Sequence, residues 1–161
     1  MIKYVRGDAT KPWINEGANI IAHVCNNAGG WGRNEGFTSA LSKRWQQPES
    51  DYRAKFSSKS ILLGQAYLIE VEPSLFVANL IAQNNYRNRH NPNPLDINAL
   101  TKCLRSLTNH LVKTFDDATI HMPRIGCGLA GGRWEEIQPV IESTLIAADI
   151  PVIVYDYHEM S

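Results

Sequence analysis

The chain has 161 residues, of which 43% are hydrophobic and 20% are charged, and its formal net charge is zero. This length suits one domain with a sizeable core, so we expect a single domain over residues 1–161. The balanced charge argues against a non-specific nucleic-acid binder, which would carry a basic excess. The first ten residues lack the order of a targeting signal, and the longest apolar runs are too short to cross a bilayer. We therefore expect a cytoplasmic protein, and three widely spaced cysteines fit that reducing compartment better than a disulfide framework.

The apolar pattern predicts six strands, at residues 2–5, 18–25, 65–71, 75–82, 119–122 and 150–155. The second of these is a continuous apolar run, which is typical of a strand buried on both faces. The third and fourth are expected to form a hairpin through Pro73 and Ser74.

Helical spacing of apolar residues predicts helices between these strands. The first covers residues 37–45 and is expected to be closed by Pro48, with a second short helix starting at Glu49. Asp96 is the predicted N-cap of the third helix, and Trp134 marks the fourth. Strands and helices alternate in the last third, which implies parallel strands with right-handed crossovers. We expect an α/β fold: a three-layer sandwich with helices on both faces of a mixed, mostly parallel sheet.

Two glycine-rich loops have the same expected position, at the carboxyl end of a buried strand and just before a helix. They cover residues 26–36 and 124–132. Ligands bind at that end of the strands in open α/β sheets, and exposed N–H groups next to a helix N-terminus favour an anion. Two such loops on neighbouring parallel strands could hold a diphosphate from opposite sides. Neither loop is a P-loop or a Rossmann fingerprint, which disfavours a dinucleotide oxidoreductase. The Asn/Arg/Pro-rich segment 84–94 is predicted to be a surface loop near the site or a mobile lid.

Three segments, GDAT, IIAHVCNNAGGWG and MPRIGCGLAGG followed after one residue by WE, resemble the signature stretches of macrodomains in order and spacing. The resemblance runs from residue 5 to residue 157, and it is to the branch of ADP-ribose-1″-phosphate phosphatases and terminal ADP-ribose glycohydrolases. It implies a partner that is ADP-ribose or a derivative: ADP-ribose-1″-phosphate, ADP-ribosylated protein or ADP-ribosylated nucleic acid. We expect no metal or other cofactor, no membrane contact and no sequence-specific nucleic-acid binding.

The resemblance also implies ligand-binding residues at matching positions. Asp8 would accept a hydrogen bond from the adenine amino group, Ala9 would offer its backbone N–H, and Tyr155 and Tyr157 would lie near the ring. The matches to the two phosphate loops are Gly30, Trp31, Gly32 and Gly36 in the first loop and Arg124, Ile125, Gly126, Cys127, Gly128, Leu129 and Ala130 in the second. Each of these positions also has a structural interpretation. Asp8 can cap a turn, and Tyr155 and Tyr157 can pack at the end of a strand with their hydroxyls in water. Arg124 can pair with a carboxylate under the site.

The candidate catalytic residues are Asn26, Asn27, Glu35 and His23. The two asparagines match positions that contact the distal ribose and orient a water, or else they satisfy the backbone of their own loop. Glu35 lies in a first loop about two residues longer than is usual in the family, as a general acid/base or as a solvated charge. His23 matches a histidine of the phosphatase-like members, but its place in a buried strand also fits a core histidine.

Two positions depart from the terminal-glycohydrolase pattern. Gln83 or Asn84 stands in place of a lysine, and Ala130 in place of an aspartate, which argues against a lysine–aspartate mechanism. A zinc set can be assembled by residue type alone from His23, Cys25, His121 and Cys127, but it lacks metal-site spacing. Cys127 is interpreted as structural, since no partner base is evident. Two functions remain open: a hydrolase acting at the distal ribose, and a module that binds ADP-ribose or a related nucleotide without turnover.

Overall fold

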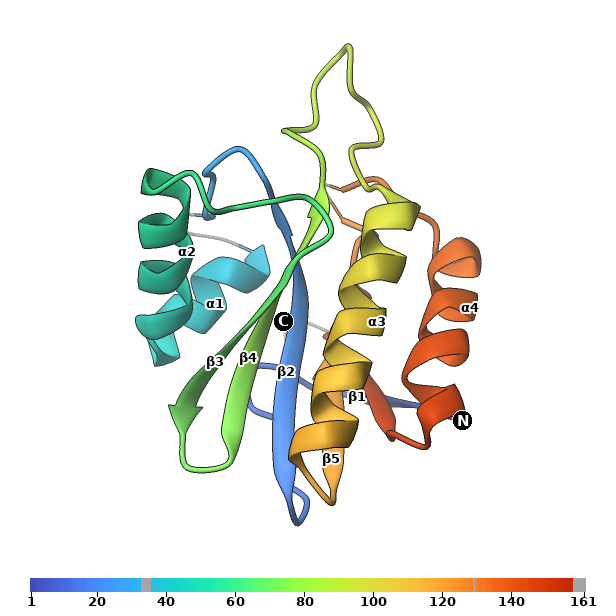
Figure 1. Ribbon diagram of the computed structural model, residues 1–161. Coiled ribbons are helices and arrows are strands. Elements are labelled where there is room, and N and C mark those ends of the chain that lie inside the picture. The colour runs from blue at the N-terminus through green and yellow to red at the C-terminus, as the bar shows by residue number, and fades with distance from the viewer. Residues whose placement is uncertain (33–35, 129, 158–161) are drawn as a thin grey trace.

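Figure 1 shows the computed structural model, which describes residues 1–32, 36–128 and 130–157. The described strands are β1 (Ile2–Arg6), β2 (Ala18–Asn26), β3 (Ala66–Glu72), β4 (Leu75–Gln83), β5 (Ala118–Met122) and β6 (Val152–Asp156). They form one sheet in the order β1-β6-β5-β2-β4-β3. All neighbours are parallel except β3, which pairs with β4 in the predicted hairpin. The strands that precede the two glycine-rich loops, β2 and β5, are neighbours, which brings the two loops to the same part of the sheet.

Helices cover both faces of this sheet. They are α1 (Gly36–Arg44), α2 (Gln47–Ser57), α3 (Ile97–Thr114) and α4 (Trp134–Thr144), with a short 3-10 helix η1 (Ile146–Ala148) before β6. One face carries α1 and α2 and the other carries α3 and α4 (Figure 1). The predicted three-layer α/β sandwich is therefore confirmed.

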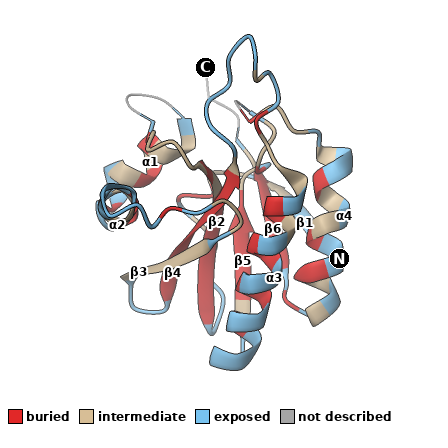
Figure 2. Ribbon diagram, turned by 45° about the horizontal axis from the view of Figure 1, so that its top comes forward, coloured by how far each residue is buried: buried red, intermediate tan, exposed pale blue. Residues whose placement is uncertain are grey.

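Burial explains the apolar pattern of the central strands, which Figure 2 shows in red between the two helical layers. Along β2, Ile20 and Ala22 pack in the cluster that includes α3 and α4, while Ile21 and Cys25 pack on the α1–α2 side. Successive side chains of a strand point to opposite faces, so a strand with helices on both sides must be apolar throughout.

The ends of the helices follow from local chemistry, with one correction. Asp96 caps α3 as predicted, because its Oδ1 accepts a hydrogen bond of 2.9 Å from the backbone N of Ala99. However, α2 begins at Gln47 and not at Glu49, with Pro48 inside its first turn and not closing the first helix. A proline is tolerated there because the N–H it lacks would have no partner within the helix.

Candidate functional site

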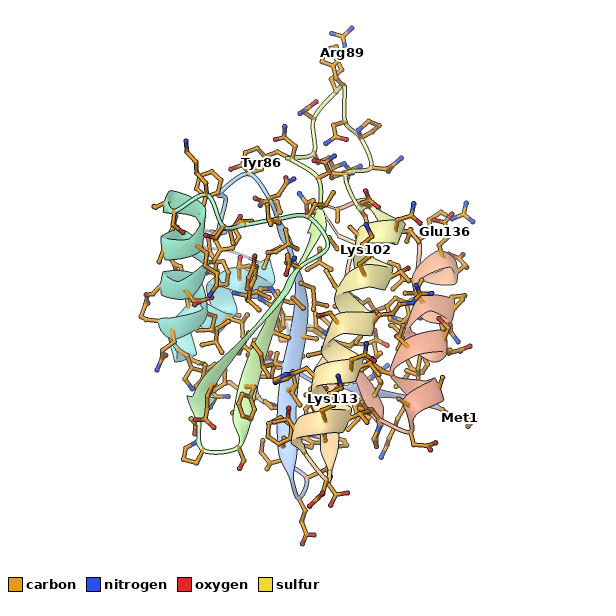
Figure 3. All side chains as sticks on the ribbon, viewed as in Figure 1. Met1, Tyr86, Arg89, Lys102, Lys113 and Glu136 are labelled. Carbon is orange, nitrogen blue, oxygen red and sulfur yellow. The ribbon has the colours of Figure 1, made fainter. Side chains whose placement is uncertain are left out.

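The loops that follow the parallel strands meet at one edge of the sheet. These are the segments after β1, β2, β4 and β5, and the segment after β4 extends farthest from the body (Figure 1). We call this segment, residues 84–94, the arm. In Figure 3, Arg89 lies at its tip, and Tyr86 lies nearer to the first glycine-rich loop.

The second glycine-rich loop presents unpaired backbone donors. It is closed by hydrogen bonds from Gly132 N to Gly126 O (2.7 Å) and from Gly131 N to Gly128 O (3.0 Å), and Gly126 and Gly131 have φ of 75° and 73°. The N–H groups of Gly126, Gly128 and Ala130 donate to no acceptor within the described part of the chain. Free amides at alternate positions of this loop, just before the N-terminus of α4, can bind an anion together with the positive end of the helix dipole.

The described part of the first glycine-rich loop, residues 26–32, is built differently, because several of its amides already have acceptors within the protein. Ala28 N and Gly30 N both donate to Asn26 Oδ1, at 2.9 and 3.1 Å, and Gly29 N donates to the Tyr52 hydroxyl at 3.1 Å. Gly32 N donates to a threonine hydroxyl at the start of α1 (3.0 Å). The amides predicted to contact phosphate at Gly30 and Gly32 thus stabilise the loop itself, and the second loop is the better supported anion site.

The two candidate asparagines have different roles in this geometry. The Asn26 side chain is committed to its own loop, since its Nδ2 also donates to Gly30 O (2.9 Å). The Asn27 side chain instead joins the loop to the arm: its Nδ2 donates to Asn84 Oδ1 (3.1 Å) and its Oδ1 accepts from Asn85 N (2.7 Å). Asn27 is therefore the predicted catalytic residue that lies where the first loop and the arm meet. Glu35 and Leu129 lie outside the described residues.

His23 is a core residue, only 2% exposed. Its Nε2 is 2.6 Å from Asn79 Oδ1, and its ring packs against Trp31 and Phe37 at 5.5 and 5.6 Å between centroids. Burial lowers the pKa of His23 to about 4, so the imidazole is neutral at physiological pH. Trp31 is also buried, and its indole N–H donates to Ser42 (2.8 Å). The geometry favours packing roles for both residues.

The segment after β1 carries the predicted adenine residues. Asp8 Oδ1 accepts from Thr10 N (2.9 Å) and from the Thr10 hydroxyl (2.7 Å), which is the turn-capping role that the sequence left open. Ala9 is buried, whereas Tyr157 is 66% exposed and accessible to a ligand.

Tyr155 belongs to a buried polar chain beneath that segment. Its hydroxyl accepts from Trp13 N (3.0 Å) and is 2.8 Å from His121 Nδ1, while His121 Nε2 is 2.8 Å from Asn19 Oδ1. An amide oxygen can only accept, so Nε2 of His121 carries the hydrogen and Nδ1 accepts from Tyr155. Burial lowers the pKa of His121 to about 4 and raises that of Tyr155. Tyr155 therefore has a packing role rather than an open ring face.

Side chains at the start of the second loop make contacts with other parts of the protein. Arg124 pairs with Asp156 at 2.7 Å, the carboxylate pairing that the sequence offered as the alternative to ligand contact, and its guanidinium also lies over the rings of Tyr4 and Trp134. Ile125 is buried, and burial raises the pKa of the Cys127 thiol, which keeps it protonated.

The arm contacts both glycine-rich loops, and sequence reasoning missed the residues that do this. The Tyr86 hydroxyl donates to Ala28 O (3.1 Å), and its ring covers Gly30, where an added Cβ would lie 2.5 Å from it. On the other side, Leu95 at the base of the arm donates its N–H to Ala130 O (2.9 Å). A tyrosine in an irregular segment carries no motif, so only the structure reveals this contact.

The zinc set considered from sequence is not assembled. Among the described residues, no three histidine, cysteine or acidic side chains are grouped so that they could hold a metal ion. No helix in the described ranges combines the length and apolar character needed to cross a bilayer.

The fold and these loops define a three-layer α/β domain with an anion-binding loop geometry at the carboxyl edge of its sheet. No family model matches the chain. A solved macrodomain protein from Streptomyces coelicolor superposes with a TM-score of 0.84 and 40% identity, over 98% of this chain and 100% of that one. A structure of a protein of unknown function from Bacteroides thetaiotaomicron has a TM-score of 0.89 and 42% identity, over 97% and 98% of the two chains. The chain belongs to the macrodomain family.

More distant relatives carry functional names. An ADP-ribose 1″-phosphate phosphatase from Candida albicans is 28% identical, over 88% of this chain and 92% of that protein. The mouse chromodomain-helicase-DNA-binding protein 1-like is 29% identical over 96% of this chain, but the chain spans only 17% of its length. The structure of Thermosipho africanus DarTG in complex with ADP-ribose has a TM-score of 0.68 at 18% identity, over 87% of this chain and 38% of that one, and shows a shared fold.

Proposed function

We propose that the protein binds ADP-ribose or a derivative at the carboxyl edge of its sheet. The observation that carries this proposal is the set of three unpaired amides, at Gly126, Gly128 and Ala130, which suits a diphosphate. The distal ribose then lies between the first loop and the arm, near Asn27. The relatives named for ADP-ribose chemistry and the ADP-ribose complex of a protein with the same fold support this ligand.

The finer proposal is hydrolysis of a group attached to the distal ribose, as an ADP-ribose-1″-phosphate phosphatase or an ADP-ribosyl hydrolase that needs no metal. Water would replace that group, and the chain would contribute orientation of the water and N–H groups directed at developing negative charge. Asn27 is the described polar residue placed to orient the water. An amide cannot act as a base, so its role is positioning of the reactants.

A second candidate is a binding module without turnover, and a specific observation favours it. Among the described candidate catalytic residues, Asn26 is used within its loop and His23 is buried and neutral. Gln83 or Asn84, and Ala130, stand where the terminal glycohydrolases have lysine and aspartate.

Calorimetry with ADP-ribose tests the binding proposal, with NAD as the comparison ligand. Asp8→Ala should weaken ADP-ribose binding by about 1–3 kcal/mol, the range for a hydrogen bond to a charged group. Asp116→Ala, an exposed acid before β5 at the opposite edge of the sheet, is the matched control and should bind normally. Absence of saturation at millimolar ADP-ribose would overturn the proposal.

A substrate panel separates the hydrolase from the binding module. The wild-type protein is incubated with ADP-ribose-1″-phosphate, mono-ADP-ribosylated protein and ADP-ribosylated DNA, and products are identified by mass spectrometry. Release of ADP-ribose from any of these supports the hydrolase. Binding of ADP-ribose with no turnover across the panel supports the binding module.

A further inference from the structure

We propose that Tyr52 is a positioning residue that fixes the first glycine-rich loop in the shape that receives the distal ribose. This inference rests on the proposed function. Tyr52 belongs to α2 and is 1% exposed, yet its hydroxyl reaches the end of β2 and the loop that follows. It is 2.8 Å from both the backbone O and the Oδ1 of Asn26, and it accepts from Gly29 N at 3.1 Å.

The chemistry of these contacts gives the hydroxyl one defined role. The amide of Gly29 can only donate, so the phenol oxygen accepts from it and the single phenol proton goes to Asn26. Burial raises the pKa of Tyr52, so the proton stays on the oxygen at physiological pH. Asn26 Oδ1 in turn accepts from Ala28 N and Gly30 N. Two side chains thus satisfy three consecutive amides of the loop.

Other groups of the same helical layer support this arrangement. Gly29 has φ of 88°, and an added Cβ would lie 2.5 Å from the Phe56 ring on α2. The Trp31 ring packs on Tyr52 with 5.4 Å between centroids and is held by the hydroxyl of Ser42 on α1. The first loop is therefore shaped by the protein before any ligand arrives, and preorganisation of this kind lowers the cost of binding.

The second loop differs from the first, because three of its backbone amides have no acceptor in the described part of the protein and are available to an anion. The hydrogen bonds made by the described residues of this loop involve neither Tyr52 nor α2. Loss of the Tyr52 hydroxyl should therefore affect the part of the ligand that contacts the first loop and spare the diphosphate. This difference between the two parts of one ligand is a readout that a merely structural role would not produce.

The experiment compares ADP and ADP-ribose by calorimetry on the wild type and on Tyr52→Phe. We expect ADP-ribose affinity to fall about fivefold to tenfold, as for one lost hydrogen bond, while ADP affinity changes by less than about twofold. Tyr67→Phe is the matched control: Tyr67 packs against the same buried cluster as Tyr52, but its hydroxyl donates to Ser60 O, away from the loop. It should bind both ligands like the wild type.

Equal losses for ADP and ADP-ribose, or no loss for either, would overturn the positioning role. If the wild type bound neither ligand, the proposed function itself would fail, which is a distinct result. Ser42→Ala provides a second route if Tyr52→Phe does not fold, because it leaves Tyr52 in place and removes the hydroxyl that accepts from the Trp31 indole (2.8 Å) and donates to Glu49 Oε1 (2.7 Å). It should give a smaller loss, of about twofold to threefold, again confined to ADP-ribose. Unchanged ADP-ribose affinity in this variant would also overturn the inference.

Discussion

The Arg124 guanidinium donates two hydrogen bonds to the Asp156 carboxylate, from Nε to Oδ1 at 2.7 Å and from Nη2 to Oδ2 at 3.1 Å. This pair joins the end of β6 to the start of the second glycine-rich loop, directly after β5. Because the Arg124 guanidinium donates these hydrogen bonds to Asp156, its pKa is raised further, so the charge is permanent. The geometry gives Arg124 a structural role beside the site, and that role can be separated from ligand contact.

We predict that Arg124→Ala lowers the free energy of unfolding by about 0.5–1 kcal/mol, since both side chains are more than one-third exposed and solvent screens the pair. ADP-ribose affinity should change by less than about threefold. Chemical denaturation and calorimetry on the same samples measure the two effects. Arg133→Ala is the control, because its guanidinium is 70% exposed and comes no closer than 3.8 Å to a carboxylate. A loss of affinity above tenfold with unchanged stability would show that Arg124 contacts the ligand.

The two buried histidines predict a pH dependence of stability. Burial holds the pKa of His23 and of His121 at about 4 in the folded protein, against 6.5 for the free side chain. Between these values the unfolded chain binds protons that the native protein does not, so the free energy of unfolding falls as pH drops from 6.5 towards 4. Above pH 6.5 the two histidines are neutral in both states and the dependence on them vanishes.

Urea denaturation at a series of pH values measures this slope. His121→Gln should make the free energy of unfolding less dependent on pH, because one fewer histidine takes up a proton on unfolding. This change in slope is expected whatever the variant does to the stability at any single pH. His110 on the exposed side of α3 is the matched control, and His110→Gln should leave the slope unchanged. A wild-type protein equally stable at pH 7 and pH 4.5 would contradict the prediction.

Substitution of two glycines of the second loop should affect the stability of the protein to different degrees. Gly131 has φ of 73°, and an added Cβ would lie 2.7 Å from the Asn93 side chain and 2.9 Å from Pro92 O. Gly131→Ala should therefore lower the free energy of unfolding by about 1–3 kcal/mol. Gly128 has open space around it, so Gly128→Ala should change stability by less than about 0.5 kcal/mol.

At Gly128 a bulky substitution should abolish ligand binding without loss of stability. Gly128→Glu should leave the melting temperature close to that of the wild type, since the position is exposed, while its carboxylate fills and repels the anion site. Binding of ADP-ribose should then be lost in calorimetry. Normal binding by Gly128→Glu would remove the second loop from the proposed site.

The sequence was sufficient for the fold because its signals are local. The apolar run before the first glycine-rich loop predicts a doubly buried strand, and Asp96 marks the start of α3. The adjacency of β2 and β5 places the two loops together, but the crossover rules give only the handedness of each connection, so it is the observed strand order that shows this adjacency. The misplaced start of α2 reflects an ambiguity of proline, which both ends helices and occupies their first turns.

The site was only partly predictable because its contacts join distant positions. Tyr52 reaches Asn26 across 26 residues, and Tyr86 reaches Ala28 across 58. Spacing in the sequence cannot show which loop amides are taken by such side chains, so Gly30 and Gly32 carried the same expectation as the second-loop glycines. Likewise, Gly128 does not adopt the positive φ that Gly131 does.

Asn27 provides the last prediction, which separates catalysis from binding. Its amide lies where the first loop meets the arm, hydrogen-bonded to Asn84 and Asn85, at the place proposed for the distal ribose. Asn27→Ala should retain ADP-ribose affinity within about tenfold. If the protein is a hydrolase, turnover of its best substrate should fall by about a hundredfold, because a water-orienting contact acts mainly in the transition state.

Loosening of the arm alone must be distinguished from loss of that contact. Asn91→Ala is the matched control: Asn91 Nδ2 donates to Asn84 O (2.9 Å) and Tyr86 O (3.0 Å), so the variant weakens the arm without touching Asn27. Single-turnover rates and calorimetric affinities are measured for both variants. A hundredfold loss of rate in Asn27→Ala with less than about fivefold in Asn91→Ala assigns the effect to the Asn27 amide, since lost transition-state contacts reduce rate more than affinity. Equal losses in the two variants would assign it to the arm, and undiminished turnover in Asn27→Ala would remove its water-orienting role.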